Sequence, residues 1–165
     1  ADGVPVGDPE IVAVTGWTVG ELDAGIDAAA PQGPFQLVTL LIGVNDQYRG
    51  RPADGYRAPF RALLARAVGF AGGEAQRVVV VSIPDWGVTP FAADRDGAAI
   101  GREIDAYNDV AREEADAAGA AFVDVTPLSR TQGALVAADG LHPSAEAYAA
   151  WAERIVPAAR VALSE

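Results

Sequence analysis

Four short apolar runs rich in β-branched residues constrain the fold of this chain more than any other feature. They cover residues 11–14, 37–42, 78–83 and 121–125. Runs of this length without polar alternation are typical of strands that are buried on both faces, as in a parallel sheet. Stretches with helical periodicity follow the runs in turn, at residues 18–30, 54–70, 95–118 and 144–163.

This alternation predicts the element order β-α-β-α-β-α-β-α. Strands that alternate with helices imply right-handed crossovers and a three-layer α/β/α domain around a parallel sheet. The chain has 165 residues, half of them hydrophobic, which fits one domain over residues 1–165. No apolar run approaches the roughly 20 residues needed to span a bilayer, so we expect no membrane span.

The charge of the chain excludes several classes of protein. It carries 23 acidic and 12 basic residues, a net charge of −11. A surface of this sign repels phosphate backbones, so we expect no binding to nucleic acid. With one histidine and no cysteine, the usual zinc sites are disfavoured as well.

Residues that could take part in binding or catalysis follow the apolar runs at their carboxyl ends. Gly16 follows the first run, Asn45 and Asp46 follow the second, and Asp139 and His142 come after the last. In an open parallel sheet these ends converge on one crevice, which is where ligands bind. The sequence therefore places a candidate site at this edge of the sheet.

Asp139 and His142 form an Asp-x-x-His unit that contains the only histidine of the chain. A carboxylate in this position can accept a hydrogen bond from Nδ1–H of the imidazole, which leaves Nε2 free to act as a base. The alternative is a surface histidine with a chance acidic neighbour, because acidic residues are abundant here.

Asn45 and Gly16 are candidates for binding a developing negative charge. The side-chain amide of Asn45 can donate to an oxyanion, although Asn-Asp after a strand is also common in turns. Glycine at position 16 lets a backbone N–H approach a ligand closely, although a tight strand-to-helix turn needs glycine too. We interpret Asp46, Arg49 and Arg51 as structural residues.

Three motifs together resemble the SGNH hydrolases, also called the GDSL esterase/lipase family. They are Thr15-Gly16-Trp17-Thr18, Gly43-Val44-Asn45-Asp46 and Asp139-Gly140-Leu141-His142-Pro143, in the family's order and approximate spacing. The resemblance covers essentially the whole chain and implies a flavodoxin-like α/β/α fold that hydrolyses small-molecule esters. It implies His142 as general base, Asp139 as its orienting acid, and Asn45 and Gly16 as oxyanion donors. It implies no metal and no organic cofactor.

The chain departs from the family at the nucleophile. The family's Gly-Asp-Ser motif, which follows the first, central strand, does not occur here, and residues 11–14 match the family's second strand. None of the four serines, Ser82, Ser129, Ser144 and Ser164, lies in a nucleophile-like turn. We therefore expect an N-terminally incomplete domain. The missing segment would carry the serine and would dock between residues 11–14 and 37–42. It would be either a separate polypeptide or a part of the same polypeptide that this sequence does not include.

Two functional hypotheses follow from these residues. The first is a carboxylic-ester hydrolase for small to medium acyl or acetyl esters, with its serine on the missing segment. The alternative is a catalytically degenerate binding or interaction protein of the same fold, which the presence of Asp139, His142 and Asn45 disfavours. A flavodoxin-like nucleotide-binding protein has less support, because the chain lacks a glycine-rich phosphate loop.

Overall fold

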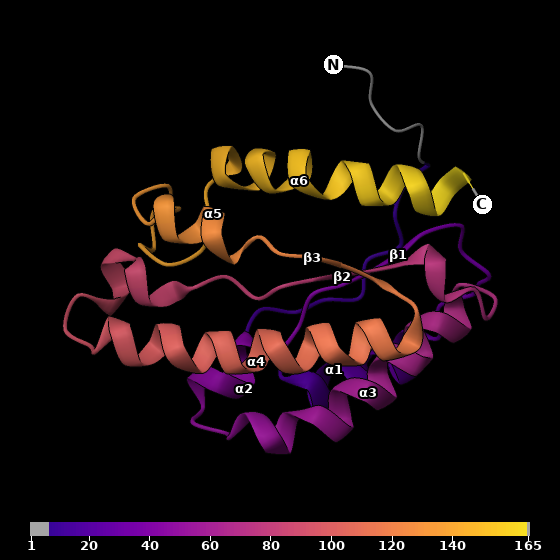
Figure 1. The fold of residues 1–165 in the computed structure, drawn as a ribbon, viewed down its shortest axis with the longest axis horizontal. Helices are drawn as coiled ribbons and strands as arrows, with labels where there is room; N and C mark the ends of the chain where they lie inside the picture. The colour runs from indigo at the N-terminus through magenta and orange to yellow at the C-terminus, as the bar shows by residue number, and fades with distance from the viewer. Residues whose placement is uncertain (1–6, 165) are drawn as a thin grey trace.

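The computed structural model describes residues 7–164, which form three layers (Figure 1). Helix α6 (Ala145–Ser164) covers one face of a central sheet. Helices α1 (Val19–Ala29), α3 (Ala53–Phe70) and α4 (Gly97–Ala118) cover the other face. The expected α/β/α architecture is therefore present.

The sheet contains three parallel strands in the order β1-β2-β3. They are β1 (Val38–Leu40), β2 (Val78–Val81) and β3 (Ala121–Val123). All four valines of the central strand β2 are buried, because helices cover both faces of the sheet. Val78 and Val80 belong to the larger core with α1, α3 and α4, and the alternate valines pack with Trp151 of α6. Three of the four predicted strands are thus confirmed.

The predicted long helices are also confirmed, and their starts have physical causes. Helix α1 begins after Thr18, whose backbone N–H donates to the Glu21 carboxylate at 2.8 Å, the contact expected from the spacing of these two residues. Helix α4 begins after Asp96, which accepts from the backbone N–H of Ala99 at 2.9 Å. It ends at Gly119, whose φ of +78° only glycine adopts without strain.

Several short helices occupy the connections. They are α2 (Val44–Tyr48), α5 (Thr126–Thr131) and the 3₁₀ turns η1 (Ala75–Arg77), η2 (Trp86–Val88) and η3 (Pro90–Ala92). Helix α2 joins the carboxyl end of β1 to the loop before α3, and η2 and η3 follow β2. None of the described helices is both long and apolar enough to cross a membrane.

The prediction of a buried strand at residues 11–14 is wrong. These residues form no strand, and the side chains of Ile11 and Val14 are 76% and 57% exposed. An extended segment becomes a strand only when a neighbour pairs with its N–H and C=O groups. Within residues 7–164, β1 pairs with β2 alone, so residues 11–14 have no partner strand.

Candidate active site

A short hairpin at residues 135–144 carries the Asp-x-x-His unit. Val136 pairs with Pro143 in antiparallel fashion, and the backbone N–H of Ala137 donates to the carbonyl of His142 at 2.7 Å. The turn contains Gly140, with a φ of +70° that favours glycine. The hairpin therefore holds Asp139 and His142 on opposite sides of one tight turn.

Asp139 and His142 are in direct contact. Oδ2 of Asp139 lies 2.6 Å from Nδ1 of His142, while Oδ1 accepts the backbone N–H groups of Leu141 at 2.9 Å and His142 at 3.0 Å. These contacts lower the pKa of Asp139 to about 2; the hydrogen bond with the imidazole is the largest cause, and the two backbone N–H donors come next. An ionised carboxylate only accepts hydrogen bonds, so Nδ1 carries the proton and Nε2 of the neutral ring is left as an acceptor.

Asn45 and Gly16 lie on neighbouring segments that helix α2 brings together. Nδ2 of Asn45 donates to the carbonyl of Trp17 at 3.0 Å, which fixes the orientation of the amide. Arg49, one residue past α2, donates to the carbonyl of Gly16 at 2.9 Å and to Glu21 at 3.2 Å. The Asn45 amide has a second N–H, which can serve an anionic ligand.

Asp46 fixes α2 against the start of α1. It is 4% exposed, and Oδ2 accepts the backbone N–H of Val19 at 2.9 Å. Oδ1 accepts from Arg51 at 2.8 Å. Asp46, Arg49 and Arg51 thus hold the loops of the site in place, in line with their structural interpretation.

Phe91 and Tyr48 connect the hairpin that carries Asp139 and His142 with helix α2, which carries Asn45. The backbone N–H of Phe91 donates to the carbonyl of Gly140 at 3.0 Å, and the Phe91 ring lies 6.3 Å from that of Tyr48 in α2. Trp86 is buried, and its Nε1 donates to Gln47 at 2.7 Å. Among residues 7–164, no hydrogen bond or ion pair links Asp139 or His142 directly to Gly16 or Asn45. The sequence places these four residues at one edge, but it does not indicate the aromatic contacts between them.

The serine hydroxyls in this structure have structural partners. Ser82 is fully buried, donates to Asp124 at 3.0 Å and accepts the backbone N–H groups of residues 125 and 126. Ser129 donates to a backbone carbonyl in α5. Ser144 accepts a backbone N–H at the start of α6, and Ser164 donates to a carbonyl at its end. None of these four hydroxyls bonds to His142.

Sequence reasoning missed the position of Arg49. The residue was interpreted as structural without a named partner, whereas its guanidinium donates to the Gly16 carbonyl. An arginine four residues after Asn45 carries no local signal for such a contact, because its partner lies 33 positions away. Within the described part of the chain, no group of three or more His, Asp or Glu side chains is arranged to hold a metal ion.

Comparisons of the chain with known proteins identify a family and solved structures that it resembles. The model of the GDSL-like lipase/acylhydrolase family matches residues 3–150. The acetylxylan esterase Axe2 of Geobacillus stearothermophilus is 22% identical, over 87% of this chain and 68% of that chain, with a TM-score of 0.64. A protein described as a GDSL-like lipase from Parabacteroides merdae is 18% identical, over 88% and 70%, with a TM-score of 0.66. At this identity the two structures show a shared fold. The comparison with curated proteins gave no match.

Proposed function

The chain belongs to the GDSL-like lipase/acylhydrolase family, and from this we propose that it is a carboxylic-ester hydrolase for small to medium acyl or acetyl esters. The observation that carries the proposal is the 2.6 Å contact between Asp139 and His142. Acetylxylan is the substrate named for one protein of the same fold, which supports an acetyl ester. The roles proposed below for individual residues rest on the geometry of the site.

His142 acts as the general base. A serine hydroxyl attacks the ester carbonyl while Nε2 of His142 takes its proton, and the same proton then goes to the leaving alcohol. Water, deprotonated in turn by Nε2, releases the acid from the acyl-enzyme. The Asp139 carboxylate holds the proton on Nδ1 throughout and stabilises the imidazolium, which its pKa of about 2 allows at neutral pH.

Gly16 and Asn45 stabilise the tetrahedral intermediate. Its oxyanion accepts from the backbone N–H of Gly16 and from the second N–H of the Asn45 amide. The contacts of Trp17 and Arg49 with these two residues fix both donors before the substrate binds. Removing one donor of this kind typically costs about 100- to 1,000-fold in kcat.

The nucleophilic serine lies on a segment outside these 165 residues. Two observations support this part of the proposal. The four serines of the chain have structural partners, and among residues 7–164 no strand pairs with one edge of β1, at the place where the family resemblance puts the serine-bearing strand. The segment belongs either to the same polypeptide or to a separate one.

Hydrolysis of 4-nitrophenyl acetate and butyrate by the protein with its serine segment tests the proposal. His142→Ala should lower kcat/KM by at least about 1,000-fold, and Asp139→Asn by a similar factor. Asp94→Asn is the matched control, since Asp94 is an exposed acid of a loop next to the site. A fluorophosphonate should label the serine segment. Labelling of Ser82, or no turnover of either ester, contradicts the proposal, and the second result favours the degenerate binding protein.

A further inference from the structure

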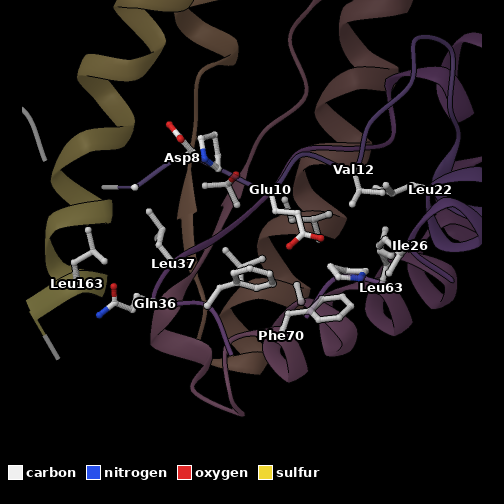
Figure 2. Close-up of a pocket in the computed structure, with 18 residues that line it drawn as sticks. Asp8, Glu10, Val12, Leu22, Ile26, Gln36, Leu37, Leu63, Phe70 and Leu163 are labelled. Carbon is white, nitrogen blue, oxygen red and sulfur yellow. The ribbon is translucent and has the colours of Figure 1, made fainter. Parts of the chain in front are cut away.

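A cavity of about 610 Å³ lies beside β1, and Figure 2 shows its lining. The carboxylates of Asp8 and Glu10 lie there among mostly apolar side chains, such as Leu63 and Phe70. None of the four proposed site residues is among the described residues that line this cavity. The parts of an ester that extend beyond its reacting carbonyl group therefore meet other side chains, on the loops that follow β1 and β2.

On these loops, the guanidinium of Arg95 lies against three aromatic rings. Its Cζ is 5.3 Å from the ring centroids of Tyr48 and Trp86 and 5.5 Å from that of Phe91. The rings are inclined to one another by 45° to 65°, so they surround the guanidinium instead of forming one flat surface. Cation–π contacts of this kind hold the side chain of an exposed arginine in one place.

Within the described part of the chain, Arg95 has no carboxylate partner. Arg49 and Arg51 each form an ion pair, whereas the side chain of Arg95 makes one long hydrogen bond, 3.4 Å from Nη2 to the Tyr48 hydroxyl. The neighbouring carboxylate of Asp96 accepts a backbone N–H at the start of α4 instead. A guanidinium has five N–H donors and aromatic rings are poor acceptors, so most of these donors are left for a ligand.

The aromatic cluster lies between helix α2 and the hairpin that carries the base. Tyr48 follows Asn45 by three residues in α2, which places both on the same side of that helix. The backbone N–H of Phe91 donates to the carbonyl of Gly140, in the turn before His142. An ester held between Asn45 and His142 can therefore place one of its two arms against the guanidinium.

We propose that Arg95, held by Tyr48 and Phe91, binds a carboxylate of the substrate, so that the enzyme prefers esters with a carboxylate on the acyl or the alcohol part. The inference rests on the proposed function. The planar guanidinium matches a carboxylate with two parallel N–H···O bonds, and the rings orient it before the substrate binds. A chain with a net charge of −11 otherwise repels an anion, so the preference depends on this arginine.

Hydrolysis of two matched pairs of esters tests the preference, with the protein that includes its serine segment. The pair of 3-acetoxybenzoate and 3-acetoxybenzamide tests a carboxylate on the alcohol part. The pair of 4-nitrophenyl hydrogen adipate and 4-nitrophenyl hexanoate tests one on the acyl part. After subtraction of the uncatalysed rate, the anionic ester of at least one pair should have a kcat/KM higher by about 3- to 10-fold, as expected for a charge pair exposed to solvent.

Variants assign the preference to Arg95. Arg95→Gln should remove it, and Arg95→Lys should keep only part of it, because an ammonium has the charge but not the planar fork. Arg77→Gln is the matched control, since it removes the same charge just before the amino end of β2, at the opposite edge of the sheet. Its ratio within each pair should equal that of the wild type. A purely structural role of Arg95 would lower Tm and slow both esters of a pair equally.

Nitrogen NMR follows binding apart from catalysis. The Nε–H signal of Arg95, identified by its loss in Arg95→Lys, should shift on titration with 3-hydroxybenzoate or adipate, with a Kd on the order of millimolar. The neutral 3-hydroxybenzamide should leave this signal in place.

The outcomes separate the carboxylate site from the proposed function. Equal kcat/KM within both pairs, or a preference that survives Arg95→Gln, overturns the inference even though the protein hydrolyses esters. If no ester is hydrolysed, the proposed function is overturned and the NMR titration decides on the site. A shift of the Arg95 signal with the carboxylates alone then upholds the site, and no shift, or an equal shift with the benzamide, overturns it.

Discussion

Replacing Asp46 should lower the free energy of unfolding more than replacing an exposed acidic residue does. Its carboxylate is buried and accepts the backbone N–H of Val19 in the first turn of α1. In Asp46→Ala this N–H is left buried without an acceptor, at a cost of about 1–3 kcal/mol. The lost charge at a helix N-terminus adds about 0.3–1 kcal/mol. The pair with the half-exposed Arg51 adds about 0.5 kcal/mol after allowance for solvent screening.

The expected total for Asp46→Ala is therefore about 2–4 kcal/mol of unfolding free energy. For a domain of this size that corresponds to a fall in Tm of about 5–15 °C. Asp46→Asn keeps an oxygen acceptor for Val19 and should lose only about 1 kcal/mol. Asp109→Ala, at an exposed position of α4, removes the same charge and is the matched control.

Urea titration followed by circular dichroism measures the three variants, with the unfolding slope m required to stay constant. Hydrogen exchange at the Val19 amide reports on the contact itself, and it should be faster in the alanine variant than in the asparagine variant. The reasoning is refuted if Asp46→Ala lies within about 0.5 kcal/mol of Asp109→Ala, which is the range of ordinary surface substitutions.

Three further predictions concern charge and burial. Carbon NMR of Asp139 should give a pKa of about 2, and His142→Ala should raise it, since the imidazole is the largest cause of its depression. The pKa of Glu114 is lowered by two arginines, so its stabilising effect is full above the unfolded value of about 4.3. The effect fades as pH falls through the lower folded value, so the difference in unfolding free energy from Glu114→Gln should shrink below about pH 4. Ser82→Ala should cost about 2–3 kcal/mol because it strands buried N–H groups, yet leave hydrolysis per folded molecule unchanged; lost activity would revive Ser82 as nucleophile.

The sequence predicts the layers of this fold because its patterns are local. The runs at 78–83 and 121–125 are apolar enough to be buried on both faces, and the strands lie there. The run at 11–14 has the same local pattern but forms no strand. A strand depends on a partner, and the described part of the chain supplies none beside this segment.

The site shows the same division between local and distant information. The contact of Asp139 with His142 follows from a spacing of three residues and could be predicted. The contacts of Arg49 with Gly16 and of Phe91 with Gly140 join segments that lie far apart in the chain. Periodicity and motif spacing contain no information about such pairs, so only the structure shows how the loops are held.

The free edge of β1 also has a consequence for colloidal stability. Two copies that met edge to edge would bring together the carboxylates of Asp8 and Glu10 from both molecules, each of which carries a net charge of −11. This repulsion opposes edge-to-edge association of the sheets at neutral pH. Acidification towards the isoelectric point of about 4.4 lowers the net charge and with it the repulsion between copies, so association at this edge and precipitation should then increase.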